Sequence, residues 1–261
     1  MTLAVPRLLL ALGVLWHVVH PGVWQREMAM ARDGPLAPVR AVVLRIDPSY
    51  VRFGLDTMSH DYGMKGAWTI DSLPVGAVVG FNAGQFTGGS PWGWLVVDGK
   101  EIQPPGKGTL GMSFVVDSAG RISLVMPGEL ASVRHSARLA FQSYPALLAA
   151  DGKLPWELEA PGRGVNLGHR DSRLAIGVAA DGSLIVALTR FTALGKTGAT
   201  IPWGPTVPEM AAFMRSLGCV RAMLLDGGIS SQLVVRGDGG RLTRWPNWRS
   251  VPLALVVNLQ R

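Results

Sequence analysis

The 261-residue sequence predicts a strand-rich α+β fold: a single domain with a mixed or antiparallel sheet and a few packed helices. A hydrophobic fraction of 48% is enough for a large core, and a charged fraction of 16% argues against a disordered chain. The 33 glycines and 18 prolines favour frequent turns. Short apolar runs bounded by turn residues provide the strands.

Most of the sheet is expected from these apolar runs. Two of them, Leu174–Val178 and Leu184–Leu188, flank the turn residues Asp181 and Gly182 and predict a hairpin. The runs between residues 94 and 125 predict an antiparallel meander. The remaining expected strands are Ala41–Ile46, Val75–Phe81, Trp94–Val97, Met112–Val116, Ile122–Val125 and Val251–Val257.

One strong helix is expected at Val207–Leu217, where apolar residues recur at helical spacing. Thr206 is a suitable N-cap, and Glu209 follows it at the capping-box distance. Gly218 is a typical residue for the C-terminal end.

The chain is divided into a signal peptide or N-terminal anchor at residues 1–31, a linker at 32–40 and the domain at 41–261. Arg7 precedes the apolar run Leu8–Trp16, which is too short to span a bilayer comfortably. Ala29-Met30-Ala31 is a cleavage pattern of small residues. We therefore expect an exported protein, periplasmic or extracellular, with membrane attachment through an uncleaved segment as the alternative.

The charge pattern limits the partners. The net charge is +7, but Lys and Arg are scattered singly, without interleaved aromatic residues. This argues against a nucleic-acid surface and fits an anionic envelope polymer or a sugar phosphate. The five histidines have no metal-ligand spacing, so neither a metal nor another cofactor is expected.

The most informative segment is Leu224–Ser231, where an apolar run ends in a carboxylate, two glycines and two serines. Asp226 is the candidate catalytic residue. The segment's exposed N–H groups and hydroxyls suit an oxygen-rich ligand, and an ordinary hairpin turn is the alternative. The candidate binding residues here are Gly227, Gly228, Ser230 and Ser231.

Three other segments carry candidate residues. Asn82 and Gly84 follow an apolar strand and suit sugar or phosphate oxygens, or form a local Asx turn. Arg173 opens another apolar strand and could bind an anion, or could lie on the surface in a salt bridge. His169 is a candidate acid or base, or an exposed loop residue. Glu209 is a candidate second carboxylate, or only a helix cap.

In this order, the segments resemble the phosphodiester glycosidase family. The resemblance implies hydrolysis of a sugar-1-phosphodiester or a related cell-envelope glycoconjugate. It implies that Asp226 is catalytic, with Glu209 as its partner, and that Arg173 and Arg249 hold the phosphate. Asp226, Asn82 and Arg173 should then line one cleft. The matching segments are Asn82–Phe86, Phe141–Leu148, Arg173–Gly177, Gly204–Ala211, Leu225–Ser231 and Arg249–Pro252.

The sequence departs from the family pattern at four positions. Ala83 and Gln85 replace Gly and Phe, Leu174 replaces Thr, and Ile229 replaces a third Gly. The change at Ile229 favours an alternative function, a non-catalytic envelope module that binds carbohydrate or an anion in the same pocket. A purely structural exported domain is a further alternative.

Overall fold

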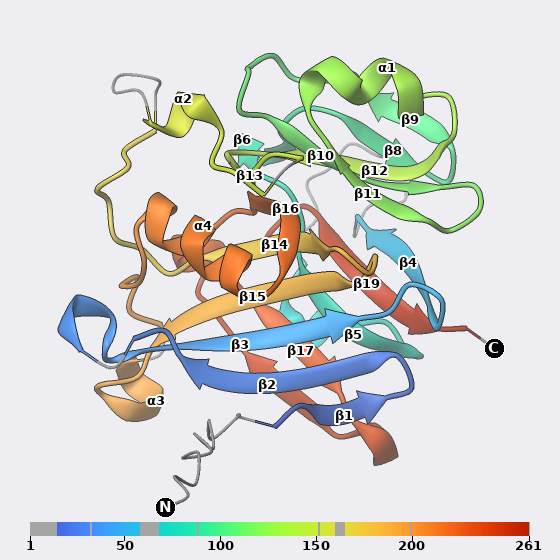
Figure 1. Ribbon diagram of the computed structural model, residues 1–261. Helices are drawn as coiled ribbons and strands as arrows, with labels where there is room; N and C mark the ends of the chain where they lie inside the picture. Colours follow the sequence, from blue (N-terminus) through green and yellow to red (C-terminus); the bar gives the residue numbers. More distant parts are fainter. Residues whose placement is uncertain are drawn as a thin grey trace, which may run out of the picture.

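The computed structural model describes residues 15–31, 33–57, 68–87, 89–150, 152–159, 165–198 and 200–260. The α+β prediction is wrong, because the protein is mostly β (Figure 1). Among the described residues only α4 (Val207–Ser216) exceeds four residues as an α-helix. Frequent Gly and Pro interrupt helices, and branched apolar residues favour strands. The four-residue helices are α1 (Leu130–Val133), α2 (Trp156–Glu159) and α3 (Gly195–Gly198).

A seven-stranded antiparallel sheet carries most of the candidate site. The predicted hairpin around Asp181 and Gly182 is confirmed as two of its central strands. In spatial order the sheet contains β1 (His17–His20), β2 (Val23–Ala29), β3 (Val39–Ile46), β15 (Leu184–Phe191), β14 (Leu174–Ala179), β16 (Cys219–Leu224) and β13 (Ala146–Leu148).

A five-stranded sheet contains β11 (Ile122–Val125), β10 (Met112–Asp117), β12 (Ala137–Ser143), β8 (Leu95–Val97) and β9 (Lys100–Gln103). The meander predicted over residues 94–125 is wrong, because β12 lies between β10 and β8 and pairs with both. The strands themselves were expected, but this later segment separates them. A long-range pairing of this kind leaves no local signal in the sequence.

A second five-stranded sheet contains β18 (Leu242–Trp245), β17 (Leu233–Arg236), β5 (Ala77–Asn82), β19 (Ala254–Leu259) and β4 (Val51–Asp56). Strands β6 (Phe86–Thr87) and β7 (Ser90–Pro91) pair with each other as a two-stranded antiparallel sheet. Short 3-10 turns are η1 (Gly34–Leu36), η2 (Ile70–Ser72), η3 (Pro127–Glu129), η4 (Gly228–Ser230) and η5 (Asp238–Gly240).

The core has two main parts. The larger one joins the three sheets and includes Leu44, Val79 and Phe141. The second lies between the seven-stranded sheet and α4, where Met210 and Met214 are fully buried. Alternate residues of a strand face opposite sides, so the sheet contributes to both parts of the core. Its strands therefore read as nearly continuous apolar runs.

Helix α4 begins as predicted. The Glu209 N–H donates to Thr206 Oγ1 over 3.4 Å, and the Thr206 N–H donates to Glu209 Oε2 over 2.8 Å. This capping box satisfies N–H groups that the first turn leaves free. The helix packs against β13 and β16 and so supports the strand that leads to Asp226.

Residues that follow the predicted leader core form part of the sheet. β2 pairs with β3 along seven residues, and Val23 is fully buried. Residues 8–14 of the leader core lie outside the described residues, and the predicted linker contains η1 and the first residues of β3. Across the described ranges, every helix is too short or too polar to cross a bilayer.

Candidate functional site

The candidate site lies where β14 begins and β16 ends. These strands are antiparallel and pair Ala175 with Leu224, so the residues before β14 lie beside those after β16. The pairing continues past the strands: the Leu225 N–H donates to the Leu174 carbonyl over 2.9 Å, and the Gly228 N–H donates to the Ser172 carbonyl over 2.8 Å. Two polar segments far apart in the sequence thus meet at one sheet end.

The Asp226 backbone is held by the end of β5. Its N–H donates to the Gly84 carbonyl over 2.9 Å, and Asn82 Nδ2 donates to its carbonyl over 2.8 Å. Asn82 Oδ1 accepts from the Gln232 N–H over 3.0 Å, and the Asn82 residue is 1% exposed. The geometry therefore gives Asn82 and Gly84 a positioning role beneath the turn.

The glycine pair is required by close packing. A Cβ on Gly227 would lie 2.8 Å from the Ser172 carbonyl oxygen. Gly228 has φ of 57°, and a Cβ there would lie 2.9 Å from Asp171 Oδ2. Any side chain would force apart the two segments that build the site.

A cavity of about 290 Å³ opens at this junction. Asp226 and Arg173 both line it, as the sequence predicts, together with His169 and Gly227. Asn82 and Glu209 do not. The rest of the lining is Gln85, Tyr144, Pro145, Val165, Asn166, Asp171, Val207, Leu224 and Leu225.

The surroundings of Asp226 favour the protonated form of its carboxyl group. Burial raises its pKa above the ordinary value, and the nearby charge of Asp171 raises it further. A hydrogen bond from Ser230 and the charge of Arg249 act in the opposite direction. Burial and a like charge both disfavour ionisation, and a displaced carboxyl pKa in a pocket is typical of catalytic sites.

Asp171 is a second pocket carboxylate that the sequence reasoning missed. Its Oδ1 is buried without a hydrogen-bond partner, and its Oδ2 lies 3.8 Å from His169 Nε2. Burial raises the pKa of Asp171, although Arg173, the Ser172 N–H and His169 lower it. The available signal was its place in the polar segment before β14, which the antiparallel pairing brings next to Asp226.

Arg173 presents a cation beside these carboxylates. Its Nε donates to the Pro205 carbonyl over 3.2 Å and its Nη2 to the His169 carbonyl over 2.8 Å. Burial lowers its pKa, and Asp171 opposes that change. Neutral carbonyls fix the guanidinium, and among the described residues no carboxylate is hydrogen-bonded to it. The group is therefore suited to bind an anion.

Glu209 is engaged elsewhere. Its two oxygens accept from Arg170 over 2.7 and 2.8 Å, and one also accepts from the Thr206 N–H. The Arg170 hydrogen bonds hold the pKa of Glu209 below its ordinary value. These contacts explain Glu209 as a helix cap and an ion-pair partner.

The remaining sequence candidates surround the turn. Ser230 bonds to Asp226, whereas buried Ser231 donates to the Gly228 carbonyl over 2.9 Å. Arg249 is exposed, and its Cζ atom lies 4.9 Å from the centre of the Phe86 ring. Its positive charge lowers the pKa of Asp226. Ser231 thus supports the turn, whereas Ser230 and Arg249 lower the pKa of the Asp226 carboxyl group.

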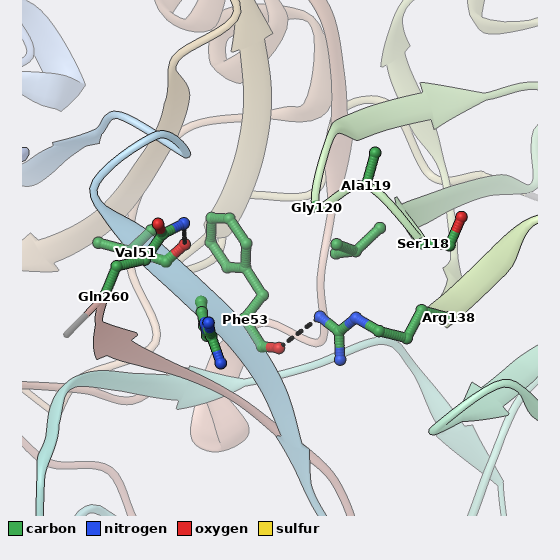
Figure 2. A pocket seen from close by; sticks show the side chains of 9 residues that line it. Val51, Phe53, Ser118, Ala119, Gly120, Arg138 and Gln260 are labelled. Atoms are coloured by element: carbon green, nitrogen blue, oxygen red, sulfur yellow. Dashed lines mark hydrogen bonds between the residues drawn. The ribbon is translucent and has the colours of Figure 1, made fainter.

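A larger cavity, of about 560 Å³, lacks comparable chemistry. Figure 2 shows its lining, in which Arg138 donates to the Phe53 carbonyl over 2.9 Å and Gln260 donates to the Val51 carbonyl over 3.0 Å. None of the described residues that line it is a carboxylate. As for metals, the described part of the chain contains no group of three His, Cys, Asp or Glu side chains able to hold an ion.

The fold recurs in solved structures. The catalytic domain of zebrafish N-acetylglucosamine-1-phosphodiester alpha-N-acetylglucosaminidase, auto-inhibited by its pro-peptide, matches with a TM-score of 0.70 and 16% identity. The match covers 94% of this chain and 86% of that one. A hypothetical protein from Synechocystis matches with a TM-score of 0.63 and 16% identity, over 92% and 62% of the two chains.

A Burkholderia pseudomallei protein, described as a candidate exported protein, matches with a TM-score of 0.63 and 18% identity, over 84% and 74% of the two chains. At these identities the likeness shows the fold. No curated protein matches the sequence.

The fold is that of the zebrafish catalytic domain, and its pocket holds two carboxylates and an arginine. The sequence profile of the phosphodiester glycosidases matches residues 75–258, which is most of the chain. The protein belongs to the phosphodiester glycosidase family, as the ordered motifs predicted.

Proposed function

We propose that this protein is an exported hydrolase that cleaves a sugar-1-phosphodiester or a related cell-envelope glycoconjugate. The observation that carries the proposal is that Asp226, Asp171 and Arg173 line one pocket. The family and the name of the zebrafish relative support a phosphodiester-linked sugar as the substrate class.

Arg173 binds the phosphate in this proposal. A phosphodiester carries one negative charge, and a guanidinium forms short, directional bonds to its oxygens. Arg249 lies close enough to influence Asp226 electrostatically and adds a second positive charge near the carboxylate. Together the two arginines orient the phosphate so that the anomeric carbon faces the carboxylates.

Asp226 acts as the nucleophile, as the base that activates water, or as the carboxylate that stabilises positive charge at the anomeric carbon. Asp171 takes the role of second carboxylate that the resemblance gave to Glu209. Two carboxylates that repel each other in a buried site titrate as a pair, so one retains a proton to higher pH. That proton is available to the departing phosphate oxygen.

The decisive test is release of product from a sugar-1-phosphodiester by wild type and Asp226→Asn. Loss of a reacting carboxylate is expected to lower kcat/KM by about 10³-fold or more. Asp98→Asn is the matched control, because Asp98 is an exposed turn residue with φ of 49°, a conformation that Asn also tolerates. Equal turnover in wild type and Asp226→Asn would reject the catalytic role.

The alternative is a module that binds its ligand without cleaving it. Ile229 favours it, because this side chain is 44% exposed beside the Asp226 turn at a position where the family has glycine. Calorimetry on the same sugar-1-phosphodiester separates the two proposals. Binding with no product after long incubation would identify the module.

Export through the N-terminal segment is part of the proposal, with a periplasmic or extracellular location. Because β1 and β2 belong to the sheet, we place any leader cleavage before His17 rather than after Ala31. Mass spectrometry of the mature N-terminus tests this. Intact protein confined to the cytoplasmic fraction would reject export, and intact protein in the membrane fraction would indicate an anchor.

A further inference from the structure

A third cavity, of about 550 Å³, gathers positive charge away from Asp226. Its lining includes residues of β2, β3 and β15 in the seven-stranded sheet and residues at the end of β18. Among the described residues, three arginines line it, Arg40, Arg190 and Arg244, with Glu27 as the single carboxylate. None of its lining residues lines the Asp226 pocket.

Arg190 is the unusual member of this group. It is only 6% exposed, and its Nη1 donates to the Pro246 carbonyl over 2.8 Å. Its Nε is buried without a hydrogen-bond partner, and within the described residues no carboxylate forms an ion pair with it. Burial lowers the pKa of Arg190 to about 10, which leaves it charged at neutral pH. A buried cation without a counter-ion is costly and calls for an anion.

The pairing of β15 with β3 places a second positive charge beside Arg190. Arg190 pairs directly with Arg40 on β3, so both guanidinium groups project from the same face. Arg40 has only a long contact to Glu27, 3.9 Å between Nε and Oε2, and both side chains are about half exposed. An exposed pair of this kind contributes little.

The third arginine does not relieve the imbalance. Arg244 Nε donates to Asp71 Oδ1 over 3.0 Å, so its own charge is matched by a carboxylate outside the cavity lining. Arg190 and Arg40 are therefore two neighbouring cations, and among the described residues only Arg40 has an acidic contact, the long one to Glu27. An oxyanion between them would supply the missing acceptor for Arg190 Nε.

We propose that Arg190 and Arg40 form a binding site for the phosphate group of an organic phosphate ester, separate from the candidate active site. Phosphate offers several acceptor oxygens, which suits two guanidinium groups. Val42, Trp245 and Pro246 give the cavity an apolar wall, which suits the organic part of an ester. The site binds and performs no reaction.

The test is calorimetric titration of the full chain with sn-glycerol 3-phosphate and, separately, with inorganic phosphate. Both are titrated into wild type and into Arg173→Met, so that binding at the Asp226 pocket is separated from binding at Arg190. We expect one molecule of glycerol 3-phosphate to bind Arg173→Met, more tightly than inorganic phosphate.

Two variants in the Arg173→Met background locate the site. Arg190→Met should abolish binding, and Arg40→Gln should weaken it about tenfold, the effect of losing one charge-assisted hydrogen bond. Arg40 is half exposed, so its variant is expected to fold even if Arg190→Met does not. Arg121→Gln is the control, because Arg121 is an exposed arginine paired with Asp117.

Three results would overturn the proposal: no binding to Arg173→Met, unchanged affinity in Arg40→Gln, or an equal loss in Arg121→Gln. Equal affinity for inorganic phosphate would overturn the assignment to an ester. Because the Asp226 assay and this titration measure different sites, failure of one leaves the other result standing.

Discussion

Arg173 and Arg190 make a useful comparison. Both guanidinium groups are desolvated, both donate to backbone carbonyls, and neither has a carboxylate within hydrogen-bond distance among the described residues. Their neighbours differ. Arg173 shares its pocket with Asp171 and Asp226, whereas Arg190 lies beside Arg40 on the neighbouring strand. In our proposals the first arrangement binds an anion and reacts with it, while the second only binds.

After Asp226→Asn, the largest effect on activity should come from Arg173. Replacing it with Met keeps the length of the side chain and removes the charge, so the phosphate loses its main partner. We expect kcat/KM for a sugar-1-phosphodiester to fall about 10²- to 10³-fold, or about 3–4 kcal/mol. Steady-state kinetics with Arg121→Gln as the exposed-arginine control measures this. A fall of less than threefold would show that Arg173 is structural.

Deleting residues 1–31 tests how far the Asp226 pocket and the Arg190 cavity depend on the hairpin of β1 and β2. The deletion removes Glu27 from the Arg190 cavity, leaves β3 without its seven-residue partner and removes buried Val19 and Val23. We expect the free energy of unfolding to fall by about 3 kcal/mol or more, since each buried Val contributes about 1.5–3 kcal/mol. Urea unfolding measures the change.

Deletion of residues 1–16, which keeps both strands, is the control for the longer deletion. Equal stability of the two shortened chains would mean that the hairpin contributes nothing to the fold. In that case cleavage after Ala31, the boundary suggested by the sequence alone, would again be acceptable.

Glu209→Gln separates capping from catalysis. Glu209 closes the capping box of α4 and pairs with Arg170 outside the pocket, so the variant should lose about 1 kcal/mol of stability and less than threefold in kcat/KM. Thermal unfolding and kinetics on one preparation provide both values. A hundredfold loss of turnover with unchanged stability would indicate that Glu209 takes part in catalysis.

The smallest effect concerns pH. Burial raises the pKa of Asp226 above the ordinary 3.8, so the folded state holds this proton more tightly than the unfolded state. Between the two pKa values the unfolded state binds fewer protons, and stability falls as pH rises through that window. Asp226→Asn lacks this contribution and should become more stable relative to wild type as pH increases. Urea unfolding across the window measures it, and a constant difference would contradict the raised pKa.

Local features of this chain could be predicted from sequence, and distant pairings could not. The hairpin around Asp181 and the Thr206 cap are set by adjacent residues, and both were predicted. The insertion of β12 between β10 and β8 depends on contacts across the chain. Helix content was overestimated because the expectation of several packed helices rested on little beyond the pattern of α4.

The same limit applies to the site. Asp226 could be proposed from sequence because a carboxylate followed by two glycines is a local pattern. Asp171 was missed because only the pairing of β14 with β16 brings it next to Asp226. Asn82 was placed in the right region, but its burial and its two backbone hydrogen bonds depend on Gln232 and Asp226, which lie far along the chain.

The segment from Pro246 to Arg249 touches both arginine regions. The Pro246 carbonyl accepts from Arg190, Asn247 Nδ2 donates to the Gly228 carbonyl over 2.6 Å, and the Arg249 N–H donates to the Ile229 carbonyl over 3.0 Å. Surface loops usually tolerate added residues. The segment from Pro246 to Arg249 should not, since one inserted amino acid would displace its contacts to Arg190 and to the Asp226 turn together. Peptide tags or grafted epitopes should therefore be placed elsewhere.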